Sequence, residues 1–355
     1  MADDIYKYDM KIEALHRTIA ASTLDEECRK MLIDFDRSLL LTEGLSKPRR
    51  LKLVFTIFLV FRTYLRKGIR EVTKEDIKDW ISAMESRNVS TWTIAGYKIA
   101  LKKFFRWLEY GDNVTRVSDT PELVGWFRIH VKKKNQPHVK ASDILTEDEI
   151  HRLIAAAEKP RDRAFISMLY ELGARISEIG NLKIGDISRD EHSYIIDLSG
   201  KTGHRTPRII MSDPFLTEWI DHHPLNKDPT APLWVIRRDG VFAKMLYGGL
   251  RELVQRLRRR AGITKRIYPH LFRHSRVTHL LMKRYLNEAQ AKVYFGWAPD
   301  SKMLSEYSHL VSRDVNDVIL QIHGITPEDK KEAPKVKECP RCRKINAADA
   351  RYCIY

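Results

Sequence analysis

The chain has 355 residues, of which 43% are hydrophobic and 31% charged, a length and composition that exclude a small disulfide scaffold and a largely disordered chain. Its 63 Lys and Arg residues outnumber the 47 Asp and Glu residues, and the net charge of +16 favours a polyanionic partner such as nucleic acid, although an ordinary basic surface has the same composition. The longest apolar run, residues 53–61, is much shorter than the ~20 residues that span a bilayer. The acidic N-terminus does not resemble a secretory signal, so we expect a cytoplasmic protein that does not contact membranes.

Residues up to about 130 are predicted to be helical throughout, because apolar residues recur at helical spacing and no strand-like alternation is sustained. One helix should cover residues 73–84, where Thr73 precedes an acidic first turn and an apolar stripe follows. A second should cover residues 90–110, where aromatic and basic residues alternate. We expect its aromatic residues in a core, whereas its lysines either face solvent or contact phosphate.

Residues 131–143 are basic, contain proline and lack an apolar period, so they are predicted to link two domains. Directly after this linker, Thr146 and Glu149 form a capping-box pattern that opens a helix over residues 150–157. The next helix is expected to end at Gly173.

Two β-rich runs, residues 193–198 and 207–211, are predicted to pair as a hairpin through a glycine-containing loop at residues 199–203. Helical patterns resume afterwards, and residues 324–338, rich in Pro, Lys and Glu, are predicted to be a flexible tether. The fold class is therefore predicted to be mainly α with a small β-sheet (α+β).

Four local signals in the second half of the chain carry candidate chemistry. They are Arg175 just past Gly173, Lys201 in the hairpin loop, His270 and Arg273 one helical turn apart, and Trp297 followed ten residues on by Tyr307. Taken singly, each has a structural interpretation: Arg175 as a helix-terminal charge, His270 as a capping or core residue, and Tyr307 as a packing residue.

The cysteines are concentrated at the end of the chain, because Cys339, Cys342 and Cys353 fall within the last 17 residues while Cys28 stands alone. The CPRC spacing is typical of a zinc knuckle rather than a disulfide. A fourth ligand is missing. The segment is therefore predicted to be a partial zinc ribbon with a structural zinc ion, or else a degenerate finger that does not fold without metal.

The order of the local signals resembles the tyrosine recombinase, or phage integrase, family. The fingerprint consists of G-x-R-x-x-E, a hairpin Lys, H-x-x-R, G-W and Y-x-H. The resemblance covers about residues 20–323 and implies a helical core-binding domain followed by a catalytic domain. A zinc ribbon at the C-terminal end further resembles some archaeal members.

The resemblance implies that Tyr307 is the nucleophile, that Arg175 and Arg273 bind the phosphate, and that His270 transfers a proton. Two guanidinium groups suit this role, because they carry fixed charge and bind non-bridging phosphate oxygens bidentately. A tyrosine with an ordinary pKa of about 10 needs a nearby acceptor or cation before it can attack, and His270 can act as the acceptor.

The resemblance also assigns three supporting residues. Lys201 is implied to protonate the leaving 5′-oxygen. Trp297 stands where the family usually has His, and its indole N–H would donate to a phosphate oxygen. Glu178 is implied to orient its neighbours. The interval of ten residues from Trp297 to Tyr307 is nine in many members, so the loop before the tyrosine is expected to be one residue longer.

The implied activity is site-specific recombination, in which DNA strands are cut and rejoined through a 3′-phosphotyrosyl intermediate without metal, cofactor or ATP. Consistent with a reaction that needs no ATP, the sequence has no nucleotide-binding P-loop motif. The implied partners are double-stranded DNA and further copies of the chain, as a tetramer on paired sites, with association to the nucleoid. A helix expected over residues 312–323 would dock on a neighbouring protomer or pack on its own domain. The alternatives are a topoisomerase-like enzyme that nicks and reseals one duplex, and a catalytically silent DNA-binding regulator.

The expected organisation has six parts. In chain order they are an N-terminal segment (1–20), a helical core-binding domain (21–130), a basic linker (131–143), a catalytic domain (144–323), a flexible tether (324–338) and a zinc-ribbon-like segment (339–355).

Overall fold

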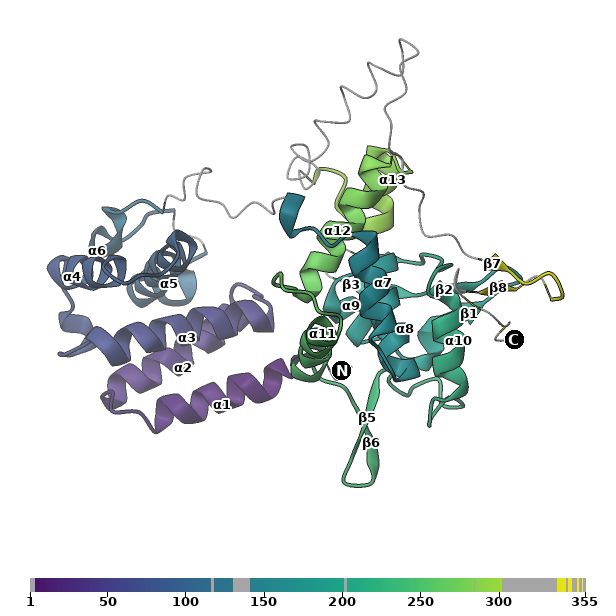
Figure 1. Ribbon diagram of the computed structural model, residues 1–355. Coiled ribbons are helices and arrows are strands. Elements are labelled where there is room, and N and C mark those ends of the chain that lie inside the picture. Colours follow the sequence, from purple (N-terminus) through teal and green to yellow (C-terminus); the bar gives the residue numbers. More distant parts are fainter. Residues whose placement is uncertain are drawn as a thin grey trace, which may run out of the picture. The chain divides into compact units, whose positions relative to one another are not determined.

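The structure is a computed structural model that describes residues 4–115, 118–129, 141–200, 203–283, 285–301, 337–342 and 344–346, together with residues 350 and 353. The chain forms two compact units, shown in Figure 1. The helical unit comprises Lys7–Pro137, and the C-terminal unit comprises Met1–Tyr6 together with His138–Tyr355. Each unit has its own buried hydrophobic cluster.

The described part of the helical unit is built from α-helices alone, apart from short 3-10 turns. These helices are α1 (Tyr8–Ala20), α2 (Glu26–Leu41), α3 (Lys47–Tyr64), α4 (Lys74–Glu85), α5 (Thr91–Tyr110) and α6 (Glu122–Gly125). Aromatic rings of α2, α3 and α5 meet in its core: the Phe61 and Phe104 ring centroids are 5.0 Å apart, and those of Phe35 and Phe104 are 5.2 Å apart, both edge to face.

The two helices predicted for this unit are confirmed with their caps. The Thr73 hydroxyl accepts the Asp76 N–H while the Asp76 carboxylate accepts the Thr73 N–H, so α4 begins in a capping box. Ser90 caps α5 through the N–H of Thr93. Of the lysines on α5, Lys98 pairs with Glu85 at 2.6 Å, so this lysine is held by an acidic partner within the unit.

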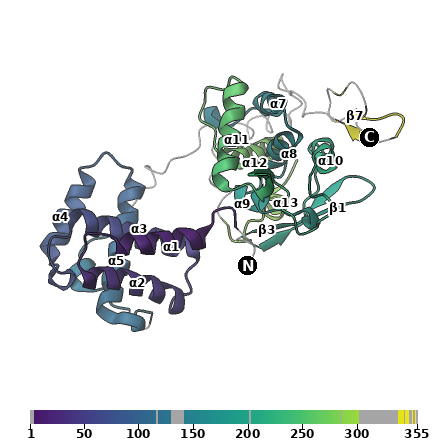
Figure 2. The ribbon, with the colours of Figure 1, turned by 90° about the horizontal axis from the view of Figure 1, so that it is seen from below.

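The C-terminal unit surrounds one helix that is buried over most of its length. Its helices are α7 (Glu147–Ala155), α8 (Pro160–Glu171), α9 (Ile176–Gly180), α10 (Asp213–Asp221), α11 (Tyr247–Arg260), α12 (Pro269–Met282) and α13 (Glu288–Phe295). Residues 164–171 of α8 are all buried. A helix without a polar face must be covered on every side, and Figure 2 shows α7, α10 and α12 around α8.

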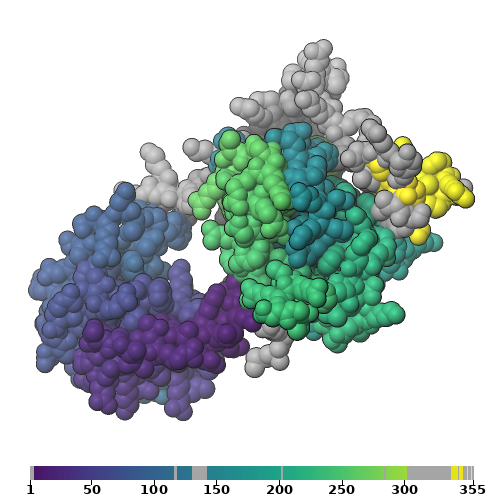
Figure 3. Space-filling model, turned by 60° about the horizontal axis from the view of Figure 1, so that its bottom comes forward, coloured from purple at the N-terminus to yellow at the C-terminus, as the bar shows by residue number. Residues whose placement is uncertain are grey.

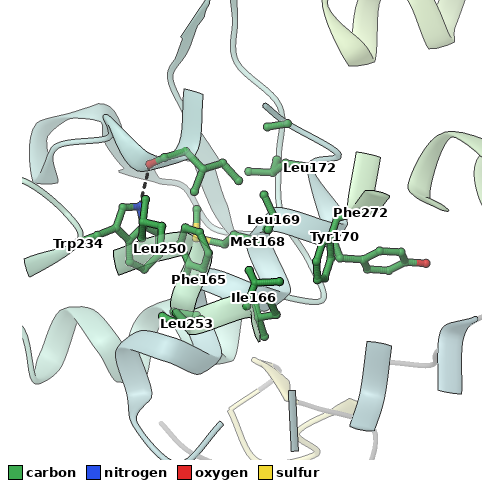
Figure 4. Packing of buried hydrophobic residues seen from close by; sticks show 14 of the residues in the cluster. Phe165, Ile166, Met168, Leu169, Tyr170, Leu172, Trp234, Leu250, Leu253 and Phe272 are labelled. Atoms are coloured by element: carbon green, nitrogen blue, oxygen red, sulfur yellow. Dashed lines mark hydrogen bonds between the residues drawn. The ribbon is translucent and has the colours of Figure 1, made fainter. Parts of the chain in front are cut away.

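In Figure 3 the light green atoms of the segment around residue 280 lie directly against the teal atoms of the segment around residue 150, so parts of this unit that are far apart in sequence share one surface. Figure 4 shows the core side chains, with Phe165 packed near Trp234. The Trp234 indole N–H donates to the carbonyl of Ile179 at 2.7 Å, which anchors the short helix α9 to the core.

The described strands form four separate two-stranded antiparallel ladders instead of one sheet. The strands are β1 (Ile187–Arg189), β2 (Tyr194–Ile196), β3 (Leu198–Gly200), β4 (Gly203–Arg205), β5 (Val235–Arg238), β6 (Val241–Lys244), β7 (Lys337–Glu338) and β8 (Ile345–Asn346). The prediction of a mainly α fold with a small amount of β-structure is confirmed.

The predicted hairpin exists, but its strands are shorter than expected and lie closer to the loop. Leu198 pairs with Arg205 and Gly200 with Gly203. An isolated bridge between Ile195 and Arg208 keeps the same register, so the two β-rich runs do face each other. They do not form one continuous ladder, because residues 194–196 pair instead with β1.

The described residues of the expected N-terminal segment (1–20) belong to two different cores. Helix α1 buries Leu15 and Ile19 in the core of the helical unit, whereas Ile5 is buried in the core of the C-terminal unit. Lys201, Tyr307, the expected helix 312–323, most of the linker and most of the tether lie outside the described residues. None of the described helices is both long and apolar enough to cross a bilayer.

Candidate active site

The turn from α8 to α9 places Arg175 at the start of a helix. Gly173 has φ +51°, a conformation that side chains other than glycine adopt only with strain. A Cβ at Gly173 would also come within 2.6 Å of the Phe295 ring, so no larger residue fits. The sharp turn puts Arg175 in the N-cap position of the short helix α9, which the sequence did not predict.

Glu178 holds Arg175 in place. The Arg175 Nη1 donates to Glu178 Oε1 at 2.6 Å, and the backbone N–H of Arg175 donates to Oε2 at 3.0 Å. Glu178 is only 3% exposed, and this burial alone would raise the pKa of its carboxyl group. Attraction to Arg205 and the hydrogen bonds from Arg175 outweigh the burial and hold that pKa below its ordinary value.

Arg205 is a site residue that the sequence analysis missed. Its Nη2 donates to Glu178 Oε2 at 3.0 Å from strand β4, so one carboxylate joins two arginines. Two glycines leave room for this arrangement: a Cβ at Gly200 would lie 2.5 Å from Glu178 Oε1, and a Cβ at Gly296 would lie 2.8 Å from Arg205 Nη1. The only available signal was its position on the strand that follows the Lys201 loop.

Arg273 lies deep in the unit, on helix α12, which begins with Pro269 at its first position. The residue is 2% exposed. Its Nη1 donates to the carbonyl of Gly173 at 2.9 Å and its Nη2 to the carbonyl of Phe295 at 2.7 Å. The guanidinium carbon is 5.5 Å from the ring centroids of both Phe295 and Trp297. Arg273 therefore connects three segments that are far apart in sequence.

His270 lies near both arginines. The residue is exposed at the surface, but the groups packed around its imidazole partly desolvate it and lower its pKa. The positive charges of Arg273 and Arg175 lower this pKa further, while Glu178 acts in the opposite direction. His270 is therefore held neutral at neutral pH and is able to accept a proton. A second histidine that the sequence analysis missed, His274, has its ring centroid 4.7 Å from that of His270.

Trp297 follows the left-handed Gly296, whose φ of +61° ends helix α13. Its side chain is nearly buried, at 8% exposed, and its ring centroid is 5.3 Å from that of Phe295. The structure thus brings Arg175, His270, Arg273 and Trp297 into one electrostatically connected region. The other two candidates, Lys201 and Tyr307, lie outside the described residues, so their positions relative to this region stay predictions.

This arrangement predicts that Glu178→Gln lowers the free energy of unfolding by about 3 kcal/mol, because it leaves two arginines beside a buried neutral amide. Chemical denaturation measures the effect. The matched control is Glu218→Gln, which breaks the more exposed pair between Glu218 and Arg163 and should cost less than about 1 kcal/mol. Equal losses in the two variants would contradict the structural role given to Glu178.

Two half-buried histidines, His274 and His279, predict a loss of stability in mild acid. The pKa of His279 is lowered to about 4, chiefly by burial, and so is that of His274. The unfolded chain binds protons below about pH 6.5 whereas these folded-state groups do not, so stability falls with pH from about 6.5 toward 4. Each histidine should contribute about 1 kcal/mol of this loss between pH 7.5 and 5.5.

Urea unfolding at several pH values measures this slope. His279→Gln should flatten it, because the titrating group is gone, whereas His192→Gln, at an exposed position, should leave it unchanged. An unaltered slope in the His279 variant would contradict the prediction.

Comparison with known proteins supports one family over most of the chain. The model of the phage integrase family matches residues 143–313, and the model of the phage integrase N-terminal SAM-like domain matches residues 32–110. Among curated relatives, tyrosine recombinase XerA of Saccharolobus solfataricus is 26% identical over 283 residues, which cover 76% of this chain and 86% of that protein.

Solved structures share the fold. XerH recombinase bound to palindromic difH substrate in a post-cleavage complex aligns with a TM-score of 0.57 at 19% identity, over 91% of this chain and 98% of that chain. A lambda integrase tetramer bound to a Holliday junction aligns with the same TM-score at 15% identity, over 78% of each chain.

Proposed function

This chain belongs to the phage integrase family of tyrosine recombinases, and on that premise we propose that it is a site-specific recombinase that cuts and rejoins DNA through a 3′-phosphotyrosyl intermediate. One observation carries the proposal: Arg273 on α12 donates to the carbonyl of Gly173, two residues before Arg175, so that His270 and Arg273 lie in the same region as Arg175 although they are almost 100 residues apart in sequence. A regulator that only binds DNA has no need for a neutral histidine in the same region as two preorganised arginines.

The two arginines bind the scissile phosphate. A phosphodiester resists attack because its oxygens gather negative charge in the transition state, and fixed guanidinium groups stabilise that charge. Arg273 is preorganised by two carbonyl groups, and Arg175 by the Glu178 carboxylate. Because these contacts are made before DNA binds, little reorganisation is needed during the reaction.

Tyr307 attacks the phosphorus, and His270 accepts the phenolic proton as the new ester bond forms. The P–O5′ bond breaks, and Lys201 protonates the leaving 5′-oxygen. Trp297 donates its indole N–H to a phosphate oxygen without changing its protonation state. The reverse sequence, with a 5′-hydroxyl of another strand as the nucleophile, rejoins the DNA and releases Tyr307. The phosphotyrosyl ester conserves the bond energy, so the cycle consumes no ATP.

The DNA partner and the assembly follow from the same reaction. Exchanging strands between two duplexes requires four cleavages, one for each protomer of a tetramer on paired sites. The lambda integrase structure is such a tetramer on a Holliday junction, and the XerH structure carries substrate DNA. The net charge of +16 suits this polyanionic partner, and it supports a location in the cytoplasm on the nucleoid.

The proposal is tested by trapping the covalent intermediate. The full chain is incubated with labelled duplexes that carry a nick near the cleavage site. The short strand that bears the new 5′-hydroxyl then diffuses away after cleavage, and rejoining fails. We expect a denaturation-resistant adduct that mass spectrometry maps to Tyr307. An adduct at another residue would reassign the nucleophile, and DNA binding with no adduct on any duplex would support the regulator instead.

A second substrate distinguishes recombination from a topoisomerase-like activity. With plasmids that carry either one or two copies of the cleaved sequence, we expect exchange only with two copies. Relaxation of the one-copy plasmid at the same rate, without exchange, would favour the nicking and resealing enzyme.

We also propose that the cysteines near the C-terminus hold a structural zinc ion. The Sγ atoms of Cys339, Cys342 and Cys353 lie within 4.8 Å of one another, and those of Cys342 and Cys353 are 3.5 Å apart. Thiolates around a tetrahedral zinc, with Zn–S bonds of about 2.3 Å, lie roughly 3.8 Å from one another, so the cluster fits the ion. Strands β7 and β8 hold the knuckle, with the Cys339 N–H donating to the carbonyl of Lys344 at 2.9 Å.

Metal analysis of the purified full chain tests the zinc site. We expect about one zinc per chain, lost in Cys353→Ser and kept in the control Cys28→Ala, whose cysteine is buried in the helical unit. Removing the zinc with a chelator should leave strand cleavage unchanged, because no step of the reaction uses it. A chain that purifies without zinc even after growth with added zinc would refute the site.

A further inference from the structure

The most informative feature outside the site is a short segment at the N-terminus. Asp4, Ile5 and Tyr6, here called the N-terminal clip, precede the helical unit in sequence but pack within the C-terminal unit. Ile5 is 1% exposed and belongs to the hydrophobic core of that unit. The chain then continues directly into the helical unit from Lys7.

The backbone of the clip is bonded on both sides. The Ile5 N–H donates to Asn181 Oδ1 at 3.1 Å, and the Ile5 carbonyl accepts the N–H of Tyr247 at 3.1 Å. Tyr247 is the first residue of α11, so its N–H has no acceptor within the helix. The clip thus caps α11 and bonds to Asn181, the C-cap residue of α9. The rings of Tyr6 and Tyr247 pack with centroids 4.9 Å apart.

The groups around Ile5 leave little free space. Gly180, the last residue of α9, lies against it, and a Cβ there would come within 2.9 Å of Ile5 Cδ1 and of Leu250 Cδ1. Lys244 donates to Asn181 Oδ1 at 2.8 Å and fixes the amide that receives the Ile5 N–H. This close packing over α9, with bonds to α11 and Asn181, is unlike the loose contact of an ordinary chain terminus.

The position of α9 matters because this helix carries the phosphate-binding machinery. It has only five residues, far fewer than the roughly 12 that an isolated helix needs to be stable. Its orientation therefore depends on contacts at its ends. Glu178 and Arg205 hold the end at Arg175. At the other end, the Trp234 indole N–H bonds to the carbonyl of Ile179, and Ile5 packs against Gly180.

We infer that the N-terminal clip is a positioning element of the recombinase: it holds α9 from behind and thereby keeps Arg175 in the place where it binds the scissile phosphate. This inference rests on the proposed function for its catalytic consequence. The docking of the clip and the electrostatic environment of His270 do not depend on that function, because both can be measured without DNA.

The test compares Ile5→Ala and Ile5→Asp with Met10→Ala, a control at a 59% exposed apolar position on α1. Hydrogen exchange at the Tyr247 amide reports whether the clip is docked. NMR titration of His270 reports whether Arg175 has moved, since that guanidinium helps to lower the pKa of His270. Single-turnover cleavage at saturating duplex reports the catalytic consequence.

In the Ile5 variants we expect exchange at Tyr247 to rise at least tenfold and the pKa of His270 to move up. Cleavage should slow about tenfold with the affinity for duplex unchanged, because a misplaced clamp acts on the rate of the bound complex. The control should match the wild type in all three readouts.

Two results would overturn the inference. Unchanged exchange at Tyr247 in Ile5→Asp would mean that the clip is not docked. Increased exchange with unaltered His270 titration and cleavage would mean that the docked clip has no influence on Arg175. If Ile5→Asp does not fold, Ile5→Ala decides both points. A wild-type protein that never cleaves DNA would refute the proposed function alone, because the exchange and titration readouts would still test the clip.

Discussion

Replacing Tyr307 by phenylalanine is expected to abolish the covalent adduct and lower strand cleavage by about 10⁴-fold or more, the scale seen when a nucleophile is removed from other enzymes. The substitution deletes a single oxygen atom, and in the proposed reaction that atom forms the bond to phosphorus. Binding of duplex DNA should remain within about twofold of the wild type, because Arg175, Arg273 and the net charge of +16 are unchanged. Gel electrophoresis of denatured, labelled complexes measures the adduct.

The matched control for this substitution is Tyr285→Phe, which removes a hydroxyl at a 56% exposed tyrosine and should form the adduct at the wild-type rate. An adduct that persists in Tyr307→Phe would show that another side chain is the nucleophile. Tyr170 and Tyr294 are poor substitutes, because burial raises the pKa of each phenol and keeps it protonated.

Much of the fold and most of the candidate site could be predicted from the sequence, because local signals specify them. Thr146 and Glu149 form the capping box that their spacing predicted, and α4 begins after Thr73 as expected. Gly173 ends its helix in the left-handed conformation, which places Arg175 correctly. Each of these features depends on residues only a few positions apart, and a single sequence contains that information.

Contacts between distant residues could not be predicted in the same way. Arg205 lies 27 positions from Glu178, and nothing in its immediate neighbours distinguishes it from other surface arginines. Ile5 lies 176 positions from Asn181, and a lone isoleucine near the N-terminus has no period to indicate a buried strand or helix. The hairpin strands were misplaced for a related reason, since pairing with β1 competes for residues 194–196.

The burial of Arg273 could not be predicted from the sequence either. This burial changes the expected effect of replacing Arg273. A phosphate-binding arginine was expected, but this one also donates to the carbonyls of Gly173 and Phe295. Arg273→Ala leaves both carbonyls without that donor in a buried place. We therefore expect the free energy of unfolding to fall by about 2–4 kcal/mol, besides a loss of cleavage of about 10³-fold or more.

Arg273→Lys separates these two consequences. A lysine keeps the charge, but its single ammonium group cannot reproduce the planar fork that reaches two carbonyls and a phosphate. We expect this variant to recover part of the stability and to cleave about 10²-fold more slowly than the wild type, with little change in affinity for duplex, because the arginine acts mainly on the transition state.

The control for Arg273 is Leu271→Ala, which removes a fully buried side chain from the same helix and should cost a similar 2–5 kcal/mol without touching the reacting atoms. Cleavage is compared at a temperature where all variants are folded. If Leu271→Ala cleaves at nearly the wild-type rate while Arg273→Ala does not, Arg273 acts on the phosphate. If both variants cleave equally slowly, Arg273 contributes only through its two hydrogen bonds to the carbonyls. Arg175 alone would then have to bind the scissile phosphate.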